Sequence, residues 1–69
     1  MEQATDLQRL FHQLNNQLGV ILASAELLEA RAADDHTRAR AARVVTSTLD
    51  AMGTAAEIRR QAEGLSPEP

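Results

Sequence analysis

The sequence contains no cysteine, tryptophan or tyrosine, and its only aromatic side chain is Phe11. Without cysteine, neither a disulfide nor a thiolate metal site can stabilise the fold. The two histidines, His12 and His36, stand far apart in the sequence, so a zinc cluster is not expected. Proline and glycine are few as well, whereas alanine is abundant and every basic residue is an arginine. This composition is typical of closely packed helices and favours an all-α fold.

Long apolar runs and an excess of basic residues are also missing. No stretch reaches the roughly 18 apolar residues of a transmembrane helix, and no basic start precedes an apolar segment as in a signal peptide. We therefore expect a soluble, cytoplasmic protein with no membrane partner. The net charge of −3 argues against nucleic-acid binding, because phosphate contacts require clustered basic residues.

Apolar residues recur in the first half of the chain at alternating intervals of four and three residues. They are Leu7, Phe11, Leu14, Leu18, Ile21, Ala25, Leu28 and Ala32. Such spacing is a heptad seam, and Leu10 and Leu22 widen it into the stripe of a four-helix bundle. The pattern predicts a first helix over about 4–33, with Thr5 and Gln8 as a capping box at its start, and a start near Glu2 as the alternative.

The second half carries a weaker helical pattern. We predict a tight turn at about 34–36, where an aspartate can cap a second helix over about 37–63. The expected inner positions of that helix are Ala42, Val45, Leu49, Met52, Ala56 and Ala62, with Ala41, Val44 and Ile58 on flanking positions. Small residues on one helix facing large ones on the other permit close approach. Gly64 is a suitable stop, and residues 65–69 are expected to form a disordered tail.

Two helices of this length cannot cover each other's apolar stripes, and 69 residues bury little surface on their own. We therefore expect an obligate homodimer, in which two antiparallel helical hairpins form a four-helix bundle with its two-fold axis along the bundle. The expected dimer core consists of Phe11, Leu14, Leu18, Ile21, Leu28, Val45, Leu49 and Met52.

Residues 12–18 read His-Gln-Leu-Asn-Asn-Gln-Leu and hold the candidate site. At 100° per residue, His12 and Asn16 lie about 40° apart and one turn along the same helical strip, with Gly19 a further turn on. That strip faces away from the apolar seam. Histidine is the side chain whose resting pKa lies nearest neutral pH, so an exposed one is a candidate for proton or phosphoryl chemistry.

The run from Phe11 to Leu22, continuing to Ala25-Glu26-Leu27-Leu28, resembles a known phosphoacceptor motif. This motif is the H-box of the dimerisation and histidine phosphotransfer (DHp, HisKA-type) domain of sensor histidine kinases. In that family a histidine is followed by an acid, an apolar residue, two polar residues, usually a proline, and a leucine. The resemblance extends over nearly the whole chain, because the family also folds as a long helical hairpin that dimerises.

The resemblance implies a role for each matching residue. His12 would accept a phosphoryl group and exchange it with an aspartate on a response-regulator receiver domain. Asn16 matches the position that orients a hydrolytic water when such proteins dephosphorylate their receiver. Gln17 and Val20 are expected to contact the receiver, although Gln17 lies about 140° from His12 on an ideal helix, and packing in the four-helix interface is the alternative for Val20. Mg²⁺ is expected on the receiver, and no cofactor or metal on this chain.

The sequence departs from the family pattern in two positions and one domain. Gln13 replaces the acid that follows the histidine, and an amide cannot accept the imidazole proton. Gln17 stands where proline is usual, which removes the helix distortion that proline imposes. The glycine-rich nucleotide boxes of an ATP-binding domain are missing, so we expect no autonomous kinase activity. A separate histidine kinase or ATPase domain would supply phosphate, whether the chain is an excised domain or a natural standalone one.

Two other interpretations stay open at this point. The first keeps the fold without the chemistry: a degenerate DHp-like dimer that regulates a kinase by binding, which Gln13 favours. The second is an RNA-binding helical hairpin dimer. That class needs basic and aromatic groups on one face, and this acidic, aromatic-poor chain has few of them.

Overall fold

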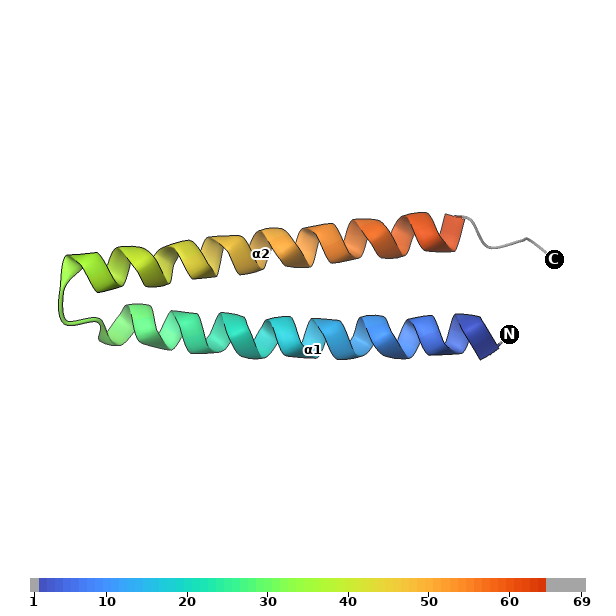
Figure 1. Ribbon diagram of the computed structural model, residues 1–69, viewed down its shortest axis with the longest axis horizontal. Helices are drawn as coiled ribbons and strands as arrows, with labels where there is room; N and C mark the ends of the chain where they lie inside the picture. Colours follow the sequence, from blue (N-terminus) through green and yellow to red (C-terminus); the bar gives the residue numbers. More distant parts are fainter. Residues whose placement is uncertain (1, 65–69) are drawn as a thin grey trace.

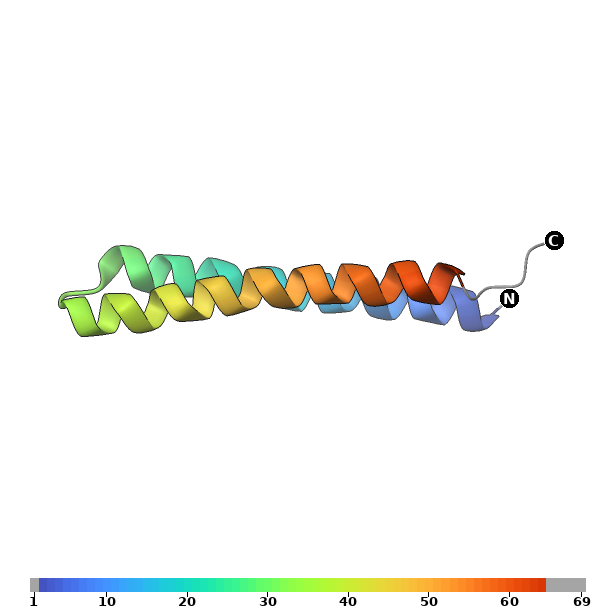
Figure 2. The ribbon, with the colours of Figure 1, turned by 90° about the horizontal axis from the view of Figure 1, so that it is seen from above.

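The chain folds into two long helices connected by a short turn. The computed structural model describes residues 2–64, with side chains described from residue 6 onward. Helix α1 spans Glu2–Arg31 and helix α2 spans Asp35–Gly64. They run antiparallel, side by side, in a rod with extents of 56 × 16 × 10 Å (Figure 1). Figure 2 shows that they cross at a shallow angle, as helices packed by heptad seams do. The predicted all-α hairpin is confirmed.

The helix ends differ from the expected ones by up to two residues. Helix α1 begins at Glu2, so Thr5 lies inside it rather than at its cap. It ends at Arg31, and the connection consists of residues 32–34 instead of 34–36. The second helix continues to Gly64, one residue past the expected end. The expected tail at 65–69 lies outside the described residues.

The start of α2 is set by Asp34. Its Oδ1 accepts a hydrogen bond from the Thr37 backbone N–H at 2.6 Å, and its carbonyl accepts the first helical bond from the Arg38 N–H at 3.1 Å. This is N-cap geometry, which satisfies an otherwise unpaired amide. The Arg38 guanidinium donates to the Ala32 carbonyl at 3.1 Å and pairs with Asp35 at 2.8 Å. The Asp34 side chain in the turn therefore caps α2, and the Arg38 side chain of α2 caps the end of α1.

The contact between the helices, here called the hairpin seam, consists mainly of small side chains. Ala25, Ala41, Thr48 and Ala55 are buried. The half-buried members of the seam are Phe11, Leu18, Leu22, Ala32, Val45 and Met52. Thr48 can lie inside because its hydroxyl donates to the Val44 carbonyl at 2.7 Å. No large side chain of the described residues is fully buried, so the hairpin by itself has only a thin core.

The structure divides the predicted seam of the first helix into two strips. Phe11, Leu18, Ala25 and Ala32 face α2, whereas Leu7, Leu14, Ile21 and Leu28 lie 38–54% exposed. The second strip has a spacing of seven residues and therefore follows one line along the helix. Of the expected dimer core, Leu14, Ile21 and Leu28 are thus uncovered in the single chain.

The most deeply buried positions of the second helix lie one residue before three of the expected inner positions. Ala41, expected on the flank, is the most deeply buried residue at 1% exposure, and Leu49, expected inside, is 52% exposed. The physical reason is that α1 presents bulky side chains, so α2 approaches closely through its alanines and Thr48. The other residues expected inside are all half-buried: Ala42, Val45, Met52, Ala56 and Ala62.

One side of the hairpin carries most of the uncovered apolar residues. Val44 and Ile21 line the same shallow hollow, together with Val20 and Leu28. Ile58 follows Val44 by two heptads and lies on the same strip of α2. We call this surface the open face; its members are Leu7, Leu14, Ile21, Leu28, Val44 and Ile58. Leu49 is five residues from Val44, about 140° around α2, and so belongs to the opposite side.

Candidate functional site

His12 lies on α1 and is exposed; in the sequence it stands between a seam residue and an open-face residue. Phe11, one position before it, packs toward α2, and Leu14, two positions after it, belongs to the open face. On a helix His12 points about 160° away from Leu14. A partner that covered the open face would therefore leave the imidazole accessible.

Asn16 and Gly19 continue the His12 strip along α1. Asn16 is exposed, and a side chain added at Gly19 would meet no atom within 4 Å. The strip that begins at His12 is thus open, with an amide one turn from the imidazole and no bulky side chain a turn further on. Such a surface can admit a macromolecular partner as well as a small phosphodonor.

The remaining expected site residues lie around the strip without converging on His12. Gln13 and Gln17 are exposed. Gln13 borders a shallow hollow with Asp6, Arg9 and Leu10, where Arg9 pairs with Asp6. Val20, 66% exposed, borders the hollow of the open face instead. Of the expected residues, only His12 and Asn16 therefore share one strip.

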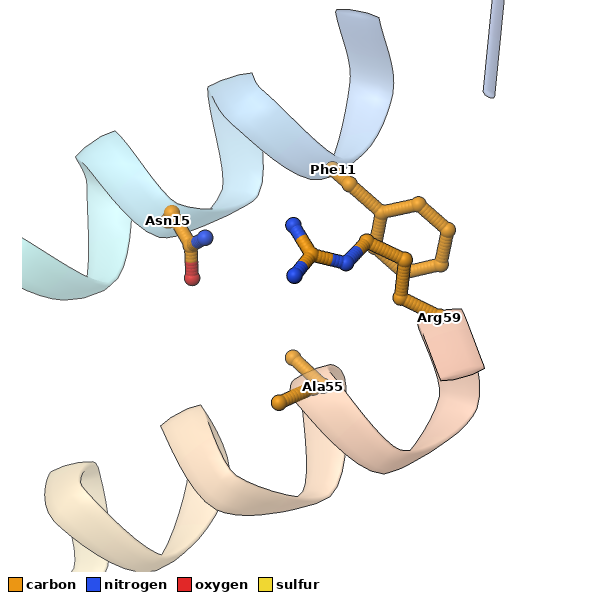
Figure 3. A pocket seen from close by; sticks show the side chains of 5 residues that line it. Phe11, Asn15, Ala55 and Arg59 are labelled. Atoms are coloured by element: carbon orange, nitrogen blue, oxygen red, sulfur yellow. The ribbon is translucent and has the colours of Figure 1, made fainter. Parts of the chain in front are cut away.

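A second feature next to His12 is a small hollow between the helices. It has a volume of about 30 Å³ and is lined by Phe11, Asn15, Ala55, Ala56 and Arg59. Figure 3 shows Arg59 extending from α2 toward α1, with its terminal nitrogens directed at Asn15. The Arg59 side chain is 51% exposed, and its Nε lies 3.9 Å from the Glu63 carboxylate. The hollow therefore holds an amide and a guanidinium from opposite helices.

Neither Asn15 nor Arg59 was expected at the site from the sequence. A signal did exist. Arg59 follows Val45 and Met52 at intervals of seven residues, and Asn15 precedes Leu22 by seven. Both therefore occupy heptad positions at the edge of the contact between the helices, where a polar side chain can reach across to the other helix.

The other hydrogen bonds and ion pairs near the ends of the hairpin join residues that are close in the sequence. Arg60 pairs with Glu57, which also accepts a hydrogen bond from Gln61 at 3.3 Å. Among residues 2–64, no three His, Cys, Asp or Glu side chains gather closely enough to hold a metal ion. Neither α1 nor α2 has a stretch long and apolar enough to cross a membrane.

No known protein family, curated protein or solved structure matches this chain. A functional assignment therefore depends on the residues of the site and on the physical properties of the fold.

Proposed function

We propose that this chain is a histidine phosphotransfer and dimerisation module of two-component signalling. The observation that carries the proposal is the position of His12: exposed, one turn before Asn16, and pointing away from the open face. An imidazole there can meet a receiver domain while the apolar side of the hairpin is covered by a second copy. Phosphoryl transfer needs mainly positioning and charge stabilisation, which a helical scaffold can supply.

In the proposed reaction, a ring nitrogen of His12 attacks the phosphorus of an aspartyl phosphate on a receiver domain. A P–O bond breaks, an N–P bond forms, the aspartate leaves as a carboxylate, and the imidazole N–H proton passes to water. Mg²⁺ bound by the receiver would neutralise charge on the phosphoryl oxygens. For the reverse role, removal of phosphate from the receiver, the Asn16 amide can hydrogen-bond an attacking water.

Dimerisation belongs to the proposal because the single chain leaves several large apolar side chains uncovered and has a large accessible surface. Its accessible area is 5646 Å², roughly 1,400 Å² more than a compact protein of 7.5 kDa presents. A standard protein interface removes about 800 Å² from each partner. Association through the open face of two hairpins would yield a four-helix bundle and cover the strip that includes Ile21.

The test is transfer from receiver domains of the source organism, each labelled on aspartate with radioactive acetyl phosphate. We expect acid-labile, base-stable label on the chain with at least one receiver. His12→Ala should abolish the label, whereas His36→Ala, a matched change at an exposed histidine in the first turn of α2, should retain it. Label that persists in His12→Ala, or no label from any receiver, would overturn the proposal.

One observation favours a second candidate function, a degenerate dimer that binds and regulates a kinase. Gln13 lacks the carboxylate that would accept the imidazole proton. In this case binding to the kinase would be unchanged by His12→Ala and lost on placing a charge on the open face. Ile21 is the suitable position for that charge, because Leu18 packs inside the hairpin seam and a charge there would damage the hairpin itself.

A further inference from the structure

Polar side chains flank the hairpin seam near both of its ends. Near the turn, Arg38 is occupied by Asp35 and the Ala32 carbonyl. Near the other end, Asn15 and Arg59 line the small hollow close to His12. Arg59 borders the hollow from the flank of the seam with its side chain 51% exposed, so its charge can meet a ligand from solvent.

The hollow opens on the same side of the hairpin as His12. On α1, Asn15 lies about 60° from His12 and less than one turn along. On α2, Ala56 is twelve residues from Val44, about 120° around the helix. Since Val44 belongs to the open face, Ala56 and the mouth of the hollow lie on the opposite flank. Arg59 is therefore accessible from the His12 side even when the open face is covered.

The Arg59 side chain has hydrogen-bonding capacity left for a ligand. Its one ion pair among the described residues joins Nε to Glu63 at 3.9 Å, which leaves the two terminal amino groups directed toward α1 (Figure 3). A guanidinium with two free N–H edges can bind two oxygens of a phosphoryl group at once. The hollow has room for about one water molecule and none for a larger ligand, so a phosphoryl group would sit at its mouth.

We propose that Arg59 and Asn15 form an oxyanion-binding pair for the phosphoryl group that His12 carries. This inference rests on the proposed function and adds a residue of the second helix to the site. Arg59 would contact two of the three phosphoryl oxygens and stabilise the charge that spreads over them during transfer. The Asn15 amide would donate to the third oxygen.

The test uses potassium phosphoramidate, a small donor that phosphorylates histidine without a receiver or kinase. The rates of labelling of His12 and His36 are measured in the same sample by ³¹P NMR, with His36 as the internal reference. We expect His12 to react about tenfold faster than His36, a modest factor because Arg59 is half exposed. Arg59→Gln should reduce the His12 rate to that of His36, and Arg59→Lys should retain part of the advantage.

Two control variants distinguish the effect of the Arg59 charge from that of the protein's net charge. Arg60→Gln removes the same charge from the next residue, which is paired with Glu57, and should leave the His12 rate unchanged. Glu63→Gln releases Nε of Arg59 and should raise it. Equal His12 rates in the native protein and Arg59→Gln, with unchanged helical circular dichroism, would overturn the inference.

The outcome is distinguishable from that of the proposed function. If receivers label His12 equally well in the native protein and in Arg59→Gln, the phosphotransfer function stands and the role of Arg59 is refuted. If no receiver labels His12 but phosphoramidate labelling depends on Arg59, the anion-binding pair stands and the receiver as phosphate donor is refuted.

Discussion

The chemistry proposed for His12 depends on where its proton goes. When a ring nitrogen attacks phosphorus, the N–H on the imidazole becomes acidic and needs an acceptor. The neighbouring Gln13 offers an amide, which is exposed and can hydrogen-bond but does not take up a proton near neutral pH. Water is a poorer base than a positioned carboxylate. In the proposed reaction, the lack of a base at position 13 is therefore expected to slow the phosphorylation of His12.

Replacing Gln13 by glutamate should raise that rate. We expect Gln13→Glu to accelerate transfer from a phosphorylated receiver to His12 by up to roughly 10²-fold, the low end of general-base contributions. The initial rate of acid-labile labelling measures the effect. Ala30→Glu adds the same charge at an exposed position far along α1 and should have no effect. An unchanged rate in Gln13→Glu would mean that proton removal does not limit transfer.

At the scale of the elements, the start of α2 is held by the Asp34 cap. The Thr37 amide donates to the Asp34 carboxylate, and these hydrogen bonds hold the pKa of Asp34 below its ordinary value. A carboxylate whose pKa is lower in the folded state stabilises the fold above its unfolded pKa. That contribution disappears as the pH falls through the folded pKa. The start of α2 is therefore expected to weaken in acid.

A comparison of melting temperatures at two pH values tests this expectation. At pH 7 the native protein should melt a few degrees above Asp34→Ala, which lacks the cap. Below about pH 4 the difference should shrink as Asp34 is protonated. Asp34→Asn keeps an uncharged cap, so its advantage over Asp34→Ala should not depend on pH. A native advantage that is equally large at pH 7 and at pH 3 would contradict the assignment of the cap.

At the scale of the whole molecule, the hairpin is a rod with a thin core. Among the residues whose side chains are described, those buried are three alanines and one threonine, and burial of such small groups gives little hydrophobic stabilisation. Six larger apolar side chains lie uncovered on the open face. Stability should therefore depend on association, and the melting temperature should rise with protein concentration.

A charge at the centre of the open face should separate the copies. We expect the native protein to sediment with about twice the mass of its 7.5 kDa chain. Ile21→Glu should sediment as a monomer and lose much of its helical signal, because a lone hairpin is marginal. Ala23→Glu places the same charge on an exposed position outside this face and should remain dimeric. A native protein that is monomeric and fully helical at micromolar concentration would refute the dimer.

The sequence alone predicted the features that depend on local spacing. Intervals of four and three between apolar residues predicted α1, and an aspartate before a polar start predicted the cap of α2, because helix periodicity and capping involve neighbours in the chain. The strip that bears His12 and Asn16 was likewise readable from the 100° turn per residue. The exact helix ends could not be predicted from the sequence. With Asp34 as its cap, α2 begins two residues earlier than expected.

The tertiary structure decided which apolar residues face which neighbour. Leu14 and Leu18 look equivalent in the sequence, yet one lies on the open face and the other in the hairpin seam. On α2, alanines rather than the larger Leu49 face α1, because the close approach of two helices favours small side chains. Asn15 and Arg59 are 44 residues apart in the chain, and only the antiparallel pairing of α1 and α2 brings them together beside His12.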